Sequence, residues 1–182
     1  MKPAVLLLTL TLVGCGLPAG TARPGAPDED VAEADDRTGD FALAVAIDEG
    51  ILAAGEPLTV ETTLTYLGDE PSVLVWGSGG GVVSFDVKRL DAGFDVQAVT
   101  PDDCERHAFE RDRPVEFPFQ KSGSWDPQNP GDDAVRAYLA DPQLRLPAGR
   151  WQITARARFW LGDSCGPPEA SLVAAVTFTT QD

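Results

Sequence analysis

Apolar and polar residues alternate along most of the chain after its first 40 residues. The alternation is clearest in residues 41–47, 58–66, 83–87, 151–159 and 172–178, where most alternate side chains are apolar. A period of two predicts strands with one buried and one solvated face. Gly, Pro and Asp separate these segments at short intervals, as turns between strands require. We therefore expect an all-β domain of about seven to nine strands.

Three segments depart from this alternation. Residues 72–76 are apolar on both faces, which predicts a central strand. Residues 100–134 are irregular and form an expected loop insertion. Within it, residues 115–119 alternate, but two prolines restrict them to an edge strand or an extended loop. Residues 135–139 fit a short helix and a strand equally well.

The first 14 residues have the three parts of an export signal. Lys2 supplies the positive charge, Ala4 to Leu12 form an apolar core, and Gly14 is the small residue at the end. The core is far shorter than the ~20 residues that span a bilayer, and no later run approaches that length. We expect residues 1–14 to be a signal peptide.

The end of this leader, Leu12-Val13-Gly14-Cys15, resembles the lipobox of bacterial lipoproteins. The resemblance implies cleavage before Cys15 and acyl chains, including palmitate, on that cysteine. The chain would then be anchored to a membrane by lipid and lie on the extracytoplasmic side, in the bacterial cell envelope. The alternative is an ordinary secretory signal in which Cys15 has no special role.

Residues 15–40 lack hydrophobic periodicity and are dominated by Pro, Gly, Ala, Asp and Glu. Such a composition cannot bury a core and predicts a disordered tether, which would span about 25–30 Å as a flexible coil. An acidic interaction tail is the alternative. The folded domain is expected to occupy residues 41–182.

Net charge and cysteine count narrow the possible partners. A net charge of −15 excludes nucleic acid as the expected partner and gives no attraction to anionic lipid. If lipid occupies Cys15, Cys104 and Cys165 remain, and an even remainder in an exported protein predicts one disulfide. Two free thiols, or a metal site completed by His107, are the alternatives.

Candidate chemistry is sparse in this sequence. His107 is the one histidine, and the Gly-Ser-Gly-Gly run at residues 77–80 lacks the spacing and helix of a nucleophile elbow, so we expect no enzyme and no cofactor. Metal binding is likewise not expected. Two acidic clusters offer oxygen ligands for calcium, but neither is favoured as a calcium site, and Pro127, Pro130 and Gly131 indicate a plain turn at the first. They are Asp126, Asn129, Asp132 and Asp133, and Asp102, Asp103 and Glu105 with Asp163.

Four aromatic residues fall outside the expected core faces. Phe117, Phe119 and Trp125 lie in the insertion, and Trp160 follows the polar face that carries Arg156 and Arg158. They are candidate partner-binding residues. The alternative, which we favour, is that the insertion folds over one end of the sandwich and buries them, because large exposed apolar patches are rare.

Two segments resemble known domains. Residues 55–71, which open Gly-Glu-Pro, resemble the early strands of bacterial immunoglobulin-like domains, and Leu146-Pro147-Ala148-Gly149-Arg150-Trp151-Gln152-Ile153 resembles their penultimate strand. Trp151 takes the aromatic place of a tyrosine corner. With the Phe85-Asp86-Val87 strand and the Asp91-Ala92-Gly93 turn, the layout over residues 43–99 and 144–180 resembles the intracellular proteinase inhibitor (BsuPI) family. The resemblance implies an immunoglobulin-like antiparallel β-sandwich.

These observations favour a non-enzymatic binding or structural module of the cell envelope. Its working end would be the insertion and the turn at residues 161–170, joined by the disulfide, and its partner would be an envelope protein or a glycan. Protease inhibition by the same loops, which the family resemblance implies, is the alternative function. A hydrolytic enzyme is disfavoured because the sequence offers no convincing base.

Overall fold

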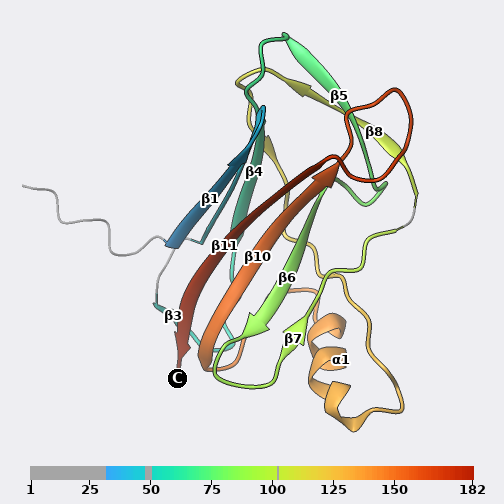
Figure 1. Cartoon of the computed structure of the whole chain (residues 1–182). Coiled ribbons are helices and arrows are strands. Elements are labelled where there is room, and N and C mark those ends of the chain that lie inside the picture. Colours follow the sequence, from blue (N-terminus) through green and yellow to red (C-terminus); the bar gives the residue numbers. More distant parts are fainter. Residues whose placement is uncertain (1–31, 48–50, 102) are drawn as a thin grey trace, which may run out of the picture.

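A computed structural model describes residues 32–47, 51–101 and 103–182 of the chain. The leader, Cys15 and residues 16–31 lie outside the described residues, as does Asp102. Figure 1 shows two facing sheets, with a two-stranded ribbon at one end and a short helix at the other.

The described residues form eleven strands, one α-helix and one short 3-10 helix. The first sheet has the order β1-β2-β4-β9, with bounds Ala32–Thr38, Phe41–Ile47, Val60–Tyr66 and Val115–Glu116. The second has the order β3-β11-β10-β6-β7, with bounds Ile51–Ala53, Ala170–Gln181, Gly149–Phe159, Val83–Arg89 and Asp95–Val96. The ribbon consists of β5 (Ser72–Gly77) and β8 (Glu105–Glu110), and the helices are η1 (Pro130–Asp132) and α1 (Asp133–Ala140).

The strand order confirms the predicted all-β sandwich of immunoglobulin type. The neighbours β6-β10-β11 are arranged as strands C-F-G of an immunoglobulin fold, and β2-β4-β9 as strands A-B-E. All pairings are antiparallel among the described strands except that of β3 with β11. Eight of the strands have six residues or more, in keeping with the expected number.

Trp151 anchors the start of β10, as its place in the sequence predicts. Its ring is buried, and its Nε1 donates a hydrogen bond to the carbonyl oxygen of Pro147 at 3.0 Å. This bond, four residues back along the chain, is the indole counterpart of a tyrosine corner.

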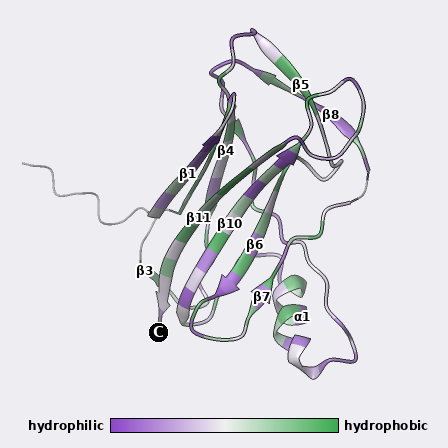
Figure 2. Ribbon diagram, viewed as in Figure 1, coloured by the Kyte–Doolittle hydropathy of each residue, from purple (hydrophilic) through white to green (hydrophobic). Residues whose placement is uncertain are grey.

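The core lies between the sheets and is built from the predicted inward faces. Along β2, β4, β10 and β11 the buried positions alternate with more exposed ones, and Figure 2 shows the corresponding changes of hydropathy along β10 and β11. Phe41 is central at one end, because its ring contacts Phe159 at 4.6 Å and Phe109 at 5.8 Å between centroids. Period-two patterning therefore predicts which faces are buried.

The expected tether is wrong for its last residues, because residues 32–38 form β1. This strand pairs antiparallel with β2 along its whole length. Ala34 packs against the core, and the Asp36 Oδ2 accepts a hydrogen bond from the Val173 amide of β11 at 2.7 Å. β1 is an edge strand, and charged residues are tolerated at a sheet edge, so its acidic composition hides the strand.

The prediction of a central strand at residues 72–76 is also wrong. β5 pairs only with β8 and touches the second sheet through one bridge, Trp76 to Trp160. Val75 is buried whereas Leu74 is 54% exposed, so one face of the ribbon covers the sandwich and the other meets solvent. Residues 105–110, expected to be irregular, supply the second strand of the ribbon, and residues 133–140 form the helix.

Candidate functional site

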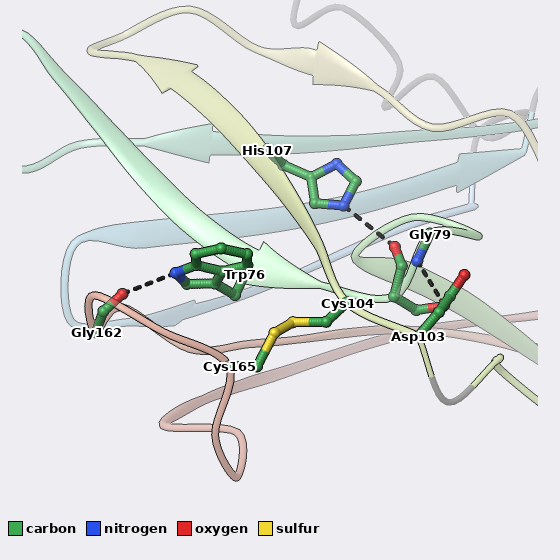
Figure 3. The surroundings of a disulfide bond; sticks show 8 residues. Trp76, Gly79, Asp103, Cys104, His107, Gly162 and Cys165 are labelled. Atoms are coloured by element: carbon green, nitrogen blue, oxygen red, sulfur yellow. Dashed lines mark hydrogen bonds between the residues drawn. A yellow bond between two sulfur atoms is a disulfide. The ribbon is translucent and has the colours of Figure 1, made fainter.

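The predicted disulfide is confirmed and ties together two segments far apart in the sequence. Cys104 immediately precedes β8, and Cys165 lies in the loop between β10 and β11, with their Cα atoms 6.4 Å apart. Figure 3 shows the bond joining that loop to the ribbon. We call this region the disulfide-held end: the ribbon, residues 77–81 and the loop at residues 161–169.

Two tryptophans fasten the ribbon to the second sheet. Trp76 and Trp160 exchange backbone hydrogen bonds of 2.8 and 3.0 Å, and Trp76 Nε1 donates to the Gly162 oxygen at 2.9 Å. The Arg106 guanidinium lies over the Trp76 ring, 5.4 Å from its centroid. The ribbon is therefore held at its Gly77 end by one covalent bond and by several polar contacts.

Asp103 organises the turn at residues 77–81. Its Oδ1 accepts hydrogen bonds from the Gly79 amide at 2.8 Å and from Ser78 Oγ at 3.1 Å. These bonds, first that from Gly79 and then that from Ser78, lower the pKa of the Asp103 carboxyl below its ordinary value. A Cβ on Gly79 would collide with Asp103 Oδ2, so a larger residue at this position would displace the carboxylate that holds the turn.

His107 does not form a catalytic pair with Ser78. It lies half-buried on β8, although the sequence places it in the segment expected to be irregular. Its Nε2 is 3.2 Å from the backbone oxygen of Ser78, so this nitrogen donates a proton to a carbonyl and cannot accept one from Ser78 Oγ. The arrangement seen in Figure 3 braces the turn.

A concavity of about 700 Å³ lies beside the disulfide on the outer face of the second sheet. Its floor comes from β6, β10 and β11, and loops at residues 97–101 and 166–168 form two sides. We call it the sheet concavity. Its lining residues with polar or aromatic side chains are Ser78, Ser84, Asp86, Gln97, Thr100, Asp103, Arg156, Arg158, Trp160 and Ser171.

The two arginines on the floor of the sheet concavity have different surroundings. Arg156 Nε is 2.5 Å from Asp86 Oδ2, and Asp86 Oδ1 accepts a further bond from the Ala98 amide at 2.9 Å. The exposed Arg158 side chain has no ion pair or hydrogen bond with any residue that the structure describes. Among the described charged groups that line this concavity, Arg158 is the one without such a partner.

The four candidate partner-binding aromatics lie in separate places. Trp160 lines the sheet concavity. Phe117 and Phe119 are half-buried against the core, where Phe119 contacts the buried Phe85 at 5.0 Å between centroids. Trp125 is 40% exposed at the other end of the sandwich. The insertion therefore folds along the sandwich and does not gather these rings into one patch.

The oxygen atoms of the first candidate calcium cluster are engaged in local hydrogen bonds. Asp132 Oδ2 accepts a hydrogen bond from the Asp126 amide at 2.8 Å, and Asp132 Oδ1 accepts one from Asn129 Nδ2. Asn129 Oδ1 accepts a hydrogen bond from the Gly131 amide and so caps η1. In the second cluster, Asp103 holds the turn. Among the residues that the structure describes, no group of three or more His, Cys, Asp or Glu side chains is placed to hold a metal ion.

The opposite end of the molecule, which we call the helix end, carries an apolar concavity of about 550 Å³ beneath α1. Phe94 contacts Tyr138 at 5.5 Å and Trp151 at 5.4 Å, both edge-to-face, and burial raises the pKa of Tyr138 above its ordinary value. Lys121 Nζ donates to three carbonyl oxygens after and within the last turn of α1, those of Tyr138, Asp141 and Gln143, at 2.7, 2.9 and 2.7 Å.

The sequence did not lead us to predict the sheet concavity or the role of Lys121. A pattern in the sequence does point to the concavity, because Arg156, Arg158 and Trp160 occupy alternate positions and so share one face of a strand. No pattern in the sequence points to the role of Lys121, since its three acceptors lie 17 to 22 residues further along the chain.

Comparison with family models, curated proteins and solved structures gives no match for this chain. The strand order and the disulfide alone define the class of protein, an all-β sandwich of immunoglobulin type with a disulfide-held end. Within the described ranges, no helix combines the length and the apolarity needed to cross a membrane.

Proposed function

We propose that the protein is a lipid-anchored, extracytoplasmic lipoprotein of the bacterial cell envelope that binds a partner without catalysing a reaction. The lipobox-like Leu12-Val13-Gly14-Cys15 supports the anchor, and the Cys104–Cys165 disulfide supports an oxidising compartment. The partner would meet the disulfide-held end.

The observation that carries this proposal is the position of β1. The strand starts at Ala32, whose partner in β2 is Ile47, and ends at Thr38 beside Phe41. Because Phe41 packs against Phe109 and Phe159, β1 ends towards the disulfide-held end and begins away from it, about midway along the molecule (Figure 1). An anchor at Cys15 would therefore connect to the domain at the end of β1 that lies farther from the disulfide-held end, which would leave that end accessible to a partner.

Two surface properties support a binding role. Every residue from 161 to 169 is exposed, and the disulfide restricts this loop against the ribbon. Binding residues are commonly presented by loops on a rigid scaffold. The contact of His107 with a backbone carbonyl also supports a role without catalysis, because the one histidine is engaged in holding the turn.

Cell fractionation and site-specific crosslinking test the proposal. Cys15→Ser should move the protein from the membrane fraction to the soluble fraction. A photo-crosslinker at Leu161, which is 46% exposed at the disulfide-held end, should capture a partner in intact cells. The matched control is Leu90, which is 39% exposed towards the helix end and should capture none. Retention of Cys15→Ser in the membrane, or capture from Leu90 alone, would contradict the proposal.

Protease inhibition is the second candidate function, and the disulfide-braced loop at residues 161–169 favours it. A loop whose residues are all exposed and which is fixed by a covalent link loses little entropy when an enzyme binds it. Purified protein should then inhibit at least one member of a panel of extracellular proteases, and deletion of residues 162–164 should remove the inhibition. Absence of inhibition across the panel would reject this candidate and leave the binding role.

A further inference from the structure

A row of three side chains runs across the sheet concavity. Arg156, Arg158 and Trp160 occupy alternate positions along and just beyond β10, so they share its outer face about 7 Å apart. All three line the concavity. A ligand lying along the strand would therefore meet two guanidinium groups and an indole in succession.

Arg158 supplies the charge that selects the ligand. Arg156 is already paired with Asp86, and Asp103 is engaged by the turn, whereas no described residue pairs with the Arg158 side chain. The planar fork of a guanidinium group fits the two oxygen atoms of a carboxylate. The concavity therefore favours a ligand that carries a carboxylate.

The residues beside this row suit a hydroxyl-rich molecule. In the sheet register, Ser84 is opposite Arg156 and Ser171 is opposite Arg158, and both serines are small enough to leave the floor open. Gln97 and Thr100 add further hydrogen-bonding groups at the side. The indole ring of Trp160 offers an apolar face on which the C–H face of a sugar ring can pack.

The position of the concavity favours a glycan over a peptide. Extended peptides commonly bind by adding a strand to a free sheet edge, whereas the concavity lies on the face of β10, which pairs with β6 on one side and with β11 on the other. The net charge of −15 repels a densely charged polyanion. The matching ligand has isolated carboxylates separated by neutral sugars.

We infer that the sheet concavity binds an acidic oligosaccharide, with a sugar carboxylate on Arg158 and a sugar ring against Trp160. This inference rests on the proposed function, because it names the ligand class for the same disulfide-held end. It assigns a role to Arg156, Arg158 and Trp160, whose arrangement on the outer face of β10 is not needed for the packing of the core.

Isothermal titration calorimetry on the full-length protein in detergent tests the inference. The probe is a hyaluronan hexasaccharide, in which glucuronate alternates with N-acetylglucosamine. Chitohexaose is the neutral control, and a hexaglutamate peptide represents an acidic protein segment. The hexasaccharide should bind at least about tenfold more tightly than either control, which corresponds to one charge-assisted contact. Equal binding of chitohexaose, or tighter binding of hexaglutamate, would overturn the inference.

Matched substitutions locate the binding in the concavity. Arg158→Gln should weaken binding about tenfold, whereas Arg150→Gln, on the same outer face of β10 but at its opposite end, should leave it unchanged. Trp160→Ala should also weaken binding, whereas Trp125→Ala should not. If Trp160→Ala fails to fold, Trp160→Phe replaces it and should retain binding within about threefold, because the aromatic face remains. Unchanged binding by Arg158→Gln would overturn the inference.

The two proposals fail in different ways. If Leu161 crosslinks to a protein and the hexasaccharide does not bind, the ligand class is wrong and the proposed binding role stands. If Cys15→Ser stays in the membrane fraction, the anchor is wrong whatever the concavity binds.

Discussion

The two ends of the sandwich are stabilised in different ways. At the disulfide-held end, the ribbon buries only two hydrophobic side chains, Val75 and Phe109. A disulfide and polar contacts hold it against the second sheet. At the helix end, Phe94, Tyr138 and Trp151 pack edge-to-face under α1. A ribbon with little apolar surface to bury needs a crosslink, whereas a helix that covers aromatic rings does not.

This contrast bears on function. Loops fixed by a disulfide can stay exposed and keep one shape, because their order does not depend on burial. The residues available to a ligand, which include the 161–169 loop and Arg158 in the adjoining sheet concavity, therefore lie at or beside the disulfide-held end. The helix end is ordered by the packing of aromatic side chains, and this packing buries those side chains wholly or in part, so they offer little surface to a ligand.

Removal of the disulfide should give the largest effect. Cys104→Ser combined with Cys165→Ser opens a closed segment with a sequence separation of 61, which should lower the free energy of unfolding by about 4 kcal/mol in the chain-entropy model. Urea denaturation measures the loss. Hydrogen exchange should rise in β5 and β8 but not in α1. Ser164→Ala, in the same exposed loop, is the control and should change little. Equal exchange at both ends would refute the contrast.

Removal of the Lys121 amine should destabilise the helix end. Lys121→Met retains most of the aliphatic stem but leaves three carbonyl acceptors without their charged donor, at a cost of about 2 kcal/mol. Lys88→Met is the matched control, since the exposed Lys88–Asp95 pair is worth only about 0.5 kcal/mol. Urea denaturation compares them. Equal losses would mean that Lys121 does not stabilise the helix.

The tryptophan of each end offers a smaller test. Trp160 Nε1 is buried with no hydrogen-bond partner among the described residues, whereas Trp151 Nε1 donates to Pro147. Trp160→Phe should therefore leave stability unchanged or raise it by about 1 kcal/mol, because an unsatisfied donor is removed. Trp151→Phe should lower stability by about 2 kcal/mol through the lost bond and lost volume. Thermal unfolding distinguishes these outcomes, and a marked loss for Trp160→Phe would show that its N–H has a partner.

The smallest expected effect is a difference in salt dependence between the pKa of Asp91, at the helix end, and that of Asp103, at the disulfide-held end. The pKa of Asp91 is lowered chiefly by the Arg89 side chain, and that of Asp103 chiefly by the Gly79 amide. For both, the stabilisation is fully present above the ordinary value of 3.8 and is lost as pH falls through the lower folded value. High salt should raise the pKa of Asp91 more than that of Asp103, because salt screens a charged partner more than a backbone dipole.

Carboxyl chemical shifts measured by NMR between pH 5 and 2, at two salt concentrations, follow both groups. The Gly79 amide signal should change together with the Asp103 carboxyl. Equal salt responses for Asp91 and Asp103 would contradict the assigned causes.

The buried strand faces were predictable because their cause is local. Alternate residues of a strand point to opposite faces, so Ile153 and Val176 identify a core face from sequence alone. The Cys104–Cys165 disulfide was predictable because the chain has three cysteines, and assigning Cys15 to the lipid leaves only these two.

What the sequence hid depends on distant partners. β1 carries charges suited to an edge, and only its pairing with β2 makes it a strand. β5 is apolar enough for a central strand, but its one partner is β8. The sheet concavity requires loops 97–101 and 166–168 to stand on either side of β10, which no spacing along the chain encodes.

The orientation of β1 also sets how the domain would bear mechanical load. A pull on the N-terminal side of Ala32, against a partner held at the disulfide end, acts along the axis of β1. Seven residue pairs between β1 and β2 would then be sheared together rather than separated one after another. If the protein is anchored and binds a partner as proposed, tension between the membrane and the partner would be resisted by these residue pairs acting together.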